Sequence, residues 1–285
     1  MSSIAYQLSH PKLKLELKLE KIEKLRIHEE VIPSLVERLS NQIQRDALIK
    51  HPIIVDKRSL VVLDGMHRLA VLQHLGYRLI PVCLVNYEDP NILVKRWFRT
   101  VQGMKGMSGG KFLDVLRGLG YPITEVPEEE LDSAIDGRGA LMGITTLEGC
   151  CILRGNAESV SEKYQHVKRL ENSLRGLGFR VGYGTEEALR RLKLGELLAV
   201  VITPKARKED VIRTALSGKL LIHKSTRHII PARPLFVNVP LKWLKMDLER
   251  ANELFVRSLR RRRLRRLPPG SVLDRLYEEE LYIFE

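Results

Sequence analysis

The chain of 285 residues is long enough for one large domain or two ordinary ones. Its hydrophobic content of 44% supports a buried core, which excludes disorder as the main state. No segment approaches the roughly 18 consecutive apolar residues of a membrane helix, and the polar N-terminus lacks the apolar region of a secretory signal. We therefore expect a soluble, cytoplasmic protein that does not enter a membrane.

The chain is basic, with a formal net charge of +13. The seven arginines of VRSLRRRRLRR, from Arg257 to Arg266, account for more than half of this excess. Such a run can contact nucleic-acid phosphates, but it can equally be a solvated helix face or a tail that pairs with the acids of YEEELYIFE. No aromatic residues are interleaved for base stacking, so we favour the second interpretation. The charged fraction of 29% tilts towards that of thermophile proteins.

The three cysteines, Cys83, Cys150 and Cys151, do not form a recognisable metal or disulfide pattern. Their number is odd, two are adjacent, and none has the spacing of a zinc site. We expect them to be reduced core residues.

The first part of the chain combines strand and helix patterns. Leucines alternate with charged residues over 13–19, which predicts a half-exposed strand. Pro33 opens a predicted helix, and the runs PIIV and LVVL predict two short strands. DGMHR then opens a helix that ends at Gly76, and 80–87 predict another strand. Residues 12–87 are therefore expected to form a compact mixed α/β unit.

After Asp89 the pattern loosens, and MKGMSGGKF and EVPEEELD look like exposed connections. The elements predicted beyond them are a hairpin over 144–153, a helix ending near Gly176, a strand over 179–183, a helix after Thr185, the strand LLAVVI and a helix capped by Thr203-Pro204. Alternating strands and helices indicate a second α/β layer.

The most informative segment is LVVLDGMHRLAVLQHLGY, in which a predicted strand ends at Asp64-Gly65 and a helix starts almost at once. The free N–H groups and the positive dipole at a helix start attract anions, and Gly65 lets a ligand approach the backbone. His67 and Arg68 lie in the first turn, where a guanidinium can grip phosphate oxygens. The alternative is an ordinary Asp-Gly turn followed by a solvated helix start.

The order of helix, PIIV, strand, DGMHR, helix and IPVCLVNY resembles the core of the ParB/sulfiredoxin superfamily, in which this turn binds nucleotide phosphates. Sulfiredoxins place a reactive cysteine where this chain has Met66, and a thioether cannot supply a thiolate. ParB proteins usually carry a GERR-type turn and a downstream helix-turn-helix region, which this sequence lacks. Both branches are therefore disfavoured.

The chain is most similar to the archaeal free L-serine kinases and their bacterial siderophore-pathway relatives. A His-Glu pair before the first helix matches His28-Glu29, and the family turn DGHHR matches Asp64, Gly65, His67 and Arg68, with Met66 in place of one histidine. A tryptophan after the core strand matches Trp97. A late lysine followed by Thr-Arg-His matches Lys224, Thr226, Arg227 and His228 in HKSTRHIIP. The matches span Leu19 to Asn238 in order.

This resemblance implies a role for each matched residue. Glu29 would be the catalytic base that activates the serine hydroxyl, and Asp64 would assist it or hold Mg²⁺. Gly65, Met66, His67 and Arg68 would bind the nucleotide phosphates. The serine would be bound by Trp97, Lys224, Thr226, Arg227 and His228. Mg²⁺ would be held mainly by the phosphates, as is usual for this ion.

The resulting prediction is an α/β enzyme that transfers a phosphoryl group from ATP or ADP to free L-serine, giving O-phospho-L-serine for cysteine or related biosynthesis. The enzyme has four predicted parts: a ParB/sulfiredoxin-like nucleotide-binding core (1–100), a second, smaller α/β domain (101–217), a return to the core that carries the substrate loop (218–245) and a basic helical tail (246–285). Two alternatives stay open. One is a ParB-like nucleotide-dependent DNA-binding protein, and the other is a regulator that binds without catalysis.

Overall fold

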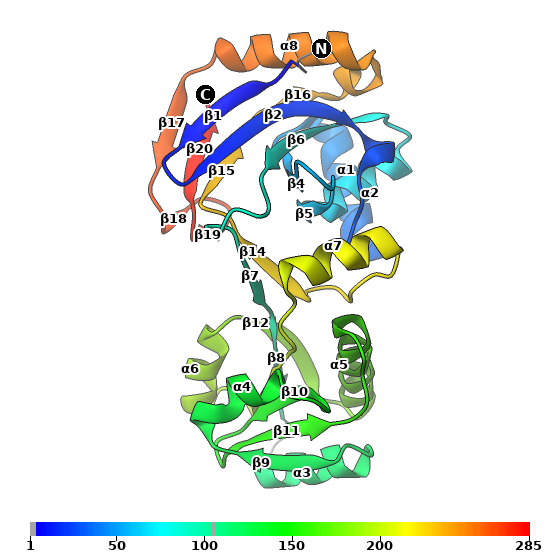
Figure 1. Cartoon of the computed structure of the whole chain (residues 1–285), viewed down its shortest axis with the longest axis vertical. Helices are drawn as coiled ribbons and strands as arrows, with labels where there is room; N and C mark the ends of the chain where they lie inside the picture. The colour runs from blue at the N-terminus through cyan, green and yellow to red at the C-terminus, as the bar shows by residue number, and fades with distance from the viewer. Residues whose placement is uncertain (1–3, 104–105) are drawn as a thin grey trace. The chain divides into compact units, whose positions relative to one another are not determined.

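The computed structural model describes residues 4–103 and 106–285, which divide into two compact units (Figure 1). Unit 1 contains the described residues up to Leu93 together with Val211–Gly218 and His228–Glu285. Unit 2 contains the described residues of Val94–Asp210 together with Lys219–Arg227. The chain crosses between the units four times: within β7 (Leu93–Arg96), within α7 (Lys208–Ser217), just after α7, and within β14 (Thr226–Ile229).

Unit 1 is built on a mixed five-stranded sheet. Its strands, in spatial order, are β1 (Tyr6–His10), β2 (Leu13–Lys21), β6 (Leu79–Val85), β4 (Ile53–Asp56) and β5 (Val62–Asp64). Strands β4 and β6 are parallel, and the other neighbours are antiparallel. The alternating leucines of β2 are buried, which confirms the predicted strand, and every residue of β6 is buried.

The helices of unit 1 cover this sheet. Helix α1 (Pro33–Asp46) contacts α2 (Met66–His74), and α8 (Leu248–Arg260) packs on β1 and β2 (Figure 1). Two short 3₁₀ turns are η1 (Ile22–Lys24) and η3 (Leu241–Lys245). Pro33 lies in the first turn of α1, and Gly76, with a φ of +70°, follows the end of α2, so both predicted helix boundaries are confirmed.

The C-terminal part of unit 1 is not the predicted helical tail. After α8 the chain forms strands, and its end lies in a three-stranded sheet ordered β15 (Ala232–Leu235), β20 (Glu280–Phe284) and β17 (Leu264–Leu267). Two small ribbons pair β3 (Leu48–Ile49) with β16 (Val239–Pro240), and β18 (Ser271–Val272) with β19 (Leu276–Tyr277). The physical reason is an apolar cluster of Leu235, Tyr277, Leu281 and Ile283, which draws the last residues into the core.

Unit 2 is built on a six-stranded antiparallel sheet. The spatial order is β12 (Arg180–Gly184), β8 (Phe98–Gln102), β13 (Ala199–Ile202), β10 (Ala140–Thr145), β11 (Cys150–Arg154) and β9 (Ile123–Val126). Its helical elements are α3 (Gly109–Gly118), η2 (Glu128–Glu130), α4 (Leu131–Ile135), α5 (Val160–Gly176) and α6 (Glu187–Lys193). The predicted hairpin is β10–β11, and the predicted helix that ends near Gly176 is α5. The expectation of a mixed α/β fold is confirmed.

Three expectations for the second part of the chain were wrong. The segment MKGMSGGKF is not a loop throughout, because Ser108 caps α3, which begins within it; Met104 and Lys105 lie outside the described residues. The acidic stretch EVPEEELD contains the end of β9, all of η2 and the start of α4. Thr203 does not cap a helix, since α7 begins only at Lys208. The buried Thr203 hydroxyl instead donates to the Trp97 carbonyl oxygen at 3.0 Å.

The boundaries of the units also differ from the predicted ones. Unit 2 begins at Val94, and residues Lys219–Arg227 belong to it. The chain enters unit 1 already at Val211, leaves it after Gly218, and makes its last return at His228 instead of the predicted residue 218. The reason is that two buried side chains of unit 2, Arg99 and Tyr164, bind the backbone of this late segment.

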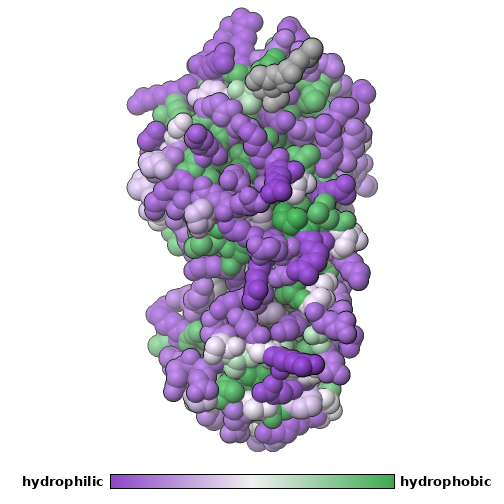
Figure 2. All heavy atoms as spheres, viewed as in Figure 1, coloured by the Kyte–Doolittle hydropathy of each residue, from purple (hydrophilic) through white to green (hydrophobic). Residues whose placement is uncertain are grey.

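The surface and the cysteines agree with the sequence pattern. The face drawn in Figure 2 is mainly hydrophilic, with small separate apolar areas. Across residues 4–103 and 106–285, no helix is both long and apolar enough to cross a bilayer. Cys83 and Cys151 are buried free thiols, and burial raises the pKa of Cys83 to about 12, so its thiol is unreactive. Cys150 is only partly buried.

One buried amide joins α8 to the central sheet. Strand β1 pairs with β2 only as far as Leu17, so the backbone of Leu19 has no strand on that side. The Asn252 side chain takes its place, accepting from the Leu19 N–H at 2.7 Å and donating to the Leu19 carbonyl oxygen at 3.1 Å.

We expect Asn252→Ala to lower the free energy of unfolding by about 2 kcal/mol, because it leaves two buried backbone groups of Leu19 unsatisfied. Urea denaturation of both proteins measures the difference. Glu253→Ala is the control, since this exposed residue of the same helix pairs only with Arg250 and should change stability by less than about 0.5 kcal/mol. Equal stability losses in the two variants would contradict the prediction.

Candidate functional site

The turn between β5 and α2 requires a glycine. Gly65 has a φ of +96°, in the left-handed region that side chains rarely adopt. A Cβ atom built on it would lie 2.5 Å from Cγ2 of Ile53 and 2.8 Å from a guanidinium nitrogen of Arg68. The backbone therefore turns tightly into α2, whose first N–H groups form the predicted anion cradle.

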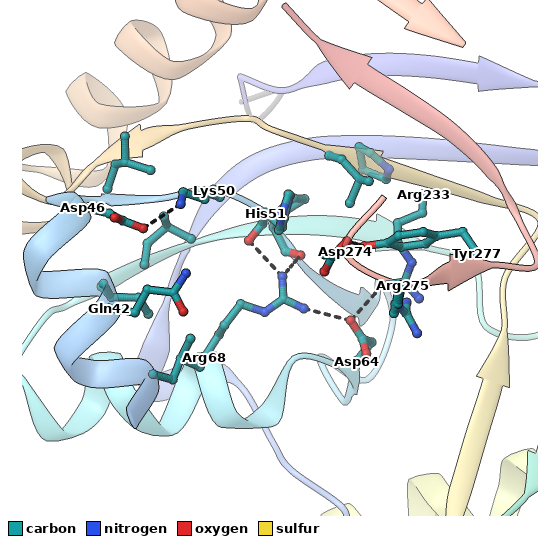
Figure 3. A pocket seen from close by; sticks show the side chains of 17 residues that line it. Gln42, Asp46, Lys50, His51, Asp64, Arg68, Arg233, Asp274, Arg275 and Tyr277 are labelled. Carbon is teal, nitrogen blue, oxygen red and sulfur yellow. Dashed lines mark hydrogen bonds and ion pairs between the residues drawn. The ribbon is translucent and has the colours of Figure 1, made fainter. Parts of the chain in front are cut away.

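Asp64 is held from two sides by arginines (Figure 3). Its Oδ2 atom accepts from Arg68 and from Arg233, each at 2.8 Å. Arg233 lies in β15. Its Nε donates at 2.5 Å to Glu279, the residue just before β20. A chain of charges thus links the first βα turn to the C-terminal sheet.

These two arginines keep Asp64 ionised. Burial on its own would raise the pKa of the carboxyl group, but the positive charges of Arg233 and Arg68 hold that pKa far below its ordinary value. The carboxylates of Asp64 and Glu279 overcome the burial of Arg233 and raise its pKa. At neutral pH Asp64 can therefore attract a cation or orient a neighbour, but it is a poor proton acceptor.

Arg68 also forms hydrogen bonds with the backbone, which could not be predicted from the sequence. Its NH1 donates to the carbonyl oxygens of His51 at 3.0 Å and Pro52 at 2.8 Å. The guanidinium thus fixes the segment before β4 as well as Asp64. Phosphate binding by Arg68 stays a prediction, and in this structure the side chain serves to position Asp64.

Glu29 lies in a segment that runs beside the turn. The N–H of Val62 donates to the Arg26 carbonyl oxygen at 2.8 Å, and the N–H of Ile32 donates to Nε2 of His67 at 3.1 Å. The residues around Glu29 are therefore hydrogen-bonded both to β5 and to the first turn of α2. Glu29 itself is only 5% exposed.

His28 supports this segment as a neutral ring. It is fully buried, and its Nδ1 donates to the carbonyl oxygen of Val62 at 2.9 Å. Burial lowers its pKa to about 4, so Nε2 is unprotonated at neutral pH. Although Nε2 lies 3.8 Å from Oε1 of Glu29, the neutral ring forms no ion pair with that carboxylate.

His67 is oriented by the same segment. Because its Nε2 accepts from the Ile32 N–H, the proton of the neutral ring is on Nδ1. Met66, which replaces the family histidine, is the first residue of α2 and is half-buried. A thioether offers no strong donor, so any polar contact made there by relatives is lost here.

A pocket of about 360 Å³ in unit 1 opens next to Asp64 (Figure 3). It is bordered by α1, the segment before β4, β15 and the ribbon that contains β19. The polar side chains around it are Gln42, Asp46, Lys50, His51, Asp64, Arg68, Arg233, Asp274 and Arg275. Apolar side chains such as Leu39, Ile43 and Leu235 form the rest of its wall. This mixture suits a ligand with both an apolar ring and anionic groups.

The predicted serine-binding residues fall into two groups. In unit 2, Nζ of Lys224 lies 3.8 Å from the centre of the Trp97 ring, and the Trp97 indole donates to the Thr226 carbonyl oxygen at 3.1 Å. Arg227 pairs with Glu186 at 2.9 Å. In unit 1, the ring of His228 packs edge-on against His28, with 5.5 Å between ring centres. Its Nε2 is 2.7 Å from the Tyr87 hydroxyl.

The protein groups fit a magnesium ion only in company with phosphates. No cluster of three or more metal-ligating side chains occurs in the part of the chain that the structure describes. Both arginine contacts of Asp64 go to Oδ2, so Oδ1 is the oxygen suited to an ion. The adjacent arginines oppose a bare dication and favour one that arrives bound to an anion.

Part of the arginine run has structural contacts. Arg262 donates to the carbonyl oxygens of Phe236 and Val237. Arg265 pairs with Glu285 at 2.7 Å, and Arg266 lies over the Tyr282 ring. The pairing of this run with the C-terminal acids agrees with the favoured interpretation.

Several residues of these sites could not be predicted from motifs. Arg233, Arg275 and Tyr277 reach the pocket from the C-terminal segment, which lies beyond the matched motifs or near their end. Glu279, from the same segment, pairs with Arg233. Arg99 is also absent from the motifs. The one available signal was that Arg99 interrupts an apolar strand pattern, and a charge there needs a partner.

Comparison with known proteins decides the family. An ATP-dependent L-serine kinase of Staphylothermus marinus is 31% identical over 239 residues, which cover 79% of this chain and 89% of that kinase. The chain belongs to the L-serine kinase family. The ADP-dependent L-serine kinase SerK of Thermococcus kodakarensis is 25% identical over 239 residues, covering 82% of this chain and 95% of SerK. No protein-family model matches the chain.

A solved structure shows that the family fold is shared. A mutant of a free serine kinase in complex with AMP matches with a TM-score of 0.67 at 21% identity, covering 84% of this chain and 97% of that one. At this identity the likeness concerns the fold alone. The predicted family and the mixed α/β fold are thereby confirmed, whereas the roles of individual residues stay predictions.

The buried His28 predicts an acid-sensitive fold. Its pKa of about 4 in the folded state lies below the ordinary 6.5, so the unfolded chain binds more protons between these values. The stabilisation is therefore present above pH 6.5 and is lost as the pH falls towards 4. From pH 7 to 5 we expect His28 to reduce the free energy of unfolding by about 2 kcal/mol. Urea denaturation at both pH values should show a smaller change for His28→Asn; equal changes would contradict this.

Breaking the ion pairs that join Asp64, Arg233 and Glu279 should destabilise the fold. Arg233→Met leaves two carboxylates near each other without their shared cation, and we expect a loss of about 3 kcal/mol. Arg265→Met is the matched control in the same small sheet, because its exposed pair with Glu285 should contribute less than about 1 kcal/mol. Thermal and urea unfolding measure both, and a small loss for Arg233→Met would show that the chain of charges is not stabilising.

Proposed function

We propose that this protein is a free L-serine kinase that transfers a phosphoryl group from a nucleotide to the serine hydroxyl, giving O-phospho-L-serine. The observation that carries the proposal is the hydrogen bonding of the Glu29 segment to both β5 and the start of α2, in a chain that belongs to the L-serine kinase family. A carboxylate and an anion cradle are then neighbours, as phosphoryl transfer to an alcohol requires.

Glu29 is the proposed base. A serine hydroxyl is a weak nucleophile at neutral pH, so its proton must be accepted as the new O–P bond forms. The oxygen of serine attacks the terminal phosphorus, the bond to the bridging oxygen breaks, and the shortened nucleotide leaves with that oxygen. The hydroxyl proton passes to the Glu29 carboxylate. Asp64 is unsuited to this step because its arginine neighbours hold its pKa far below the ordinary value, which makes its carboxylate a weak proton acceptor.

The donor phosphates would be bound by the turn after β5. The N–H groups at the start of α2 and the Nδ1–H of His67 would donate hydrogen bonds, and the adjacent arginines provide positive potential where negative charge develops. The pocket beside Asp64 would take the nucleoside, with apolar side chains of α1 against the base and Arg275 nearer the phosphates. When bound with the nucleotide, Mg²⁺ would neutralise phosphate charge, and Asp64 is the residue that would hold it.

The amino-acid substrate would be bound by the lysine and arginine of the KSTRH segment. A serine carboxylate needs a fixed cation, and Lys224 lies over Trp97, which limits its freedom. Arg227 and the Thr226 hydroxyl would complete that side. His228 follows them directly in the sequence. In unit 1 its ring lies beside that of His28, the residue that precedes the proposed base.

The direct test is a single reaction mixture of protein, L-serine, Mg²⁺ and either ATP or ADP, analysed for phosphoserine by ³¹P NMR. Both donors must be tried, because one named relative is ATP-dependent and another ADP-dependent. Absence of phosphoserine with both nucleotides would overturn the proposal. Tight, salt-sensitive DNA binding with serine-independent hydrolysis would favour the ParB-like alternative instead.

Glu29→Gln should reduce kcat by about a thousandfold, because the amide keeps the shape of the side chain but accepts no proton. Nucleotide affinity, measured by isothermal titration calorimetry, should be unchanged. Glu30→Gln is the matched control, since this neighbour is more exposed and lies outside the His-Glu register. If the two variants lose activity equally, Glu29 is not the base.

A further inference from the structure

The segment that carries Lys224 is held in place through its backbone carbonyl oxygens. The carbonyl oxygens of four consecutive residues, 223–226, each accept a hydrogen bond from a side chain of unit 2. The donors are Arg99 for the first two, Tyr164 for the third and Trp97 for the fourth. An exposed surface turn would not need such support.

Arg99 makes two of these four contacts. It lies in β8 with only 1% of its side chain exposed. NH1 donates to the Lys224 carbonyl oxygen at 2.7 Å and to that of Trp97 at 3.1 Å, and NH2 donates to the His223 carbonyl oxygen at 3.3 Å. One guanidinium therefore fixes both Lys224 and the tryptophan beneath its ammonium group.

The charge of Arg99 is balanced inside unit 2. Its Nε donates to Glu171 of α5 at 2.5 Å, and Glu171 is itself buried. A buried ion pair is expensive to desolvate and is not needed merely to fill space. Here it supplies a guanidinium whose remaining donors reach three carbonyl oxygens, which no apolar residue could do.

Lys224 also has a strained backbone. Its φ of +61° lies in the left-handed region, which is unfavourable for a lysine. The hydrogen bond from Arg99 to its carbonyl oxygen holds this conformation, and with it the ammonium 3.8 Å from the centre of the Trp97 ring. Such local strain persists only where the surroundings enforce it.

We propose that Arg99 is a positioning residue for serine binding, which acts by holding Lys224 in this conformation. The inference rests on the proposed function, because Lys224 is taken there to bind the serine carboxylate. Arg99 itself does not touch the substrate. Its loss should therefore weaken serine binding and leave nucleotide binding unchanged.

The test compares Arg99→Lys with the wild type. Lysine keeps a positive charge next to Glu171 but cannot hold Glu171 and three carbonyl oxygens together. We expect the KM for serine to rise about tenfold, with the KM for the nucleotide unchanged. Arg175→Lys is the matched control, because Arg175 contacts the same carboxylate at 3.2 Å and none of the four carbonyl oxygens. Its KM for serine should equal that of the wild type.

A double-mutant cycle separates positioning from a general structural effect. If Arg99 acts through Lys224, Arg99→Lys should raise the KM for serine much less when Lys224 is already alanine. The same increase in both backgrounds would overturn the proposal, as would a wild-type KM in the single variant. Should Arg99→Lys not fold, Tyr164→Phe removes the hydroxyl that binds the carbonyl oxygens of Ser225 at 2.7 Å and Pro204 at 2.9 Å, and it should raise the same KM about threefold.

Failure of this proposal differs from failure of the proposed function. A wild-type protein that makes no phosphoserine with either nucleotide overturns both. A wild type that makes phosphoserine, with variants at residues 99 and 164 that keep its KM for serine, overturns the role of Arg99 alone.

Discussion

The carboxylate of Asp64, shared between two arginines, is the interaction on which the geometry of unit 1 depends. Arg68 comes from the helix that follows the turn, and Arg233 comes from a strand 169 residues later in the chain. Because Gly65 forces a tight turn, the carboxylate and the helix start cannot move apart. The last strands of the chain are tied to this point through Glu279, so the C-terminal sheet forms part of the same structure rather than a separate tail.

Each unit contains a buried arginine in a similar arrangement. In each, the arginine pairs with one glutamate and donates its other hydrogen bonds to residues far away in the sequence. Arg233 pairs with Glu279 and donates to Asp64. Arg99 pairs with Glu171 and donates to the Lys224 segment. Such arrangements stabilise the fold little more than well-packed apolar residues would, because desolvation offsets the Coulomb attraction, although removing one charge from them is costly. Their value is geometric, since a planar guanidinium fixes the direction of several groups at once.

What could be predicted from the sequence was local. The leucine alternation of β2 and the DGMHR turn were found because each is determined by neighbouring residues, and the ordered motifs identified the family. Arg233 and Arg99 were missed because an isolated arginine carries no sign of a partner more than a hundred residues away. The C-terminal strands were missed for another reason: they are short, and the arginine run before them favoured a helical tail, while a few apolar residues such as Leu281 and Ile283 decide their burial.

The surroundings of the two carboxylates separate their chemistry. Asp64 is next to two guanidinium groups, and these charges hold its pKa so low that it cannot carry a proton at neutral pH. Glu29 is next to His28, a ring that burial keeps neutral, so its neighbour adds no charge that would suppress proton uptake. An acid held between fixed cations, as Asp64 is, suits metal or phosphate chemistry better than proton transfer. For Glu29, the proposed base, the burial of His28 matters because a protonated imidazole at that position would make the carboxylate a weaker proton acceptor.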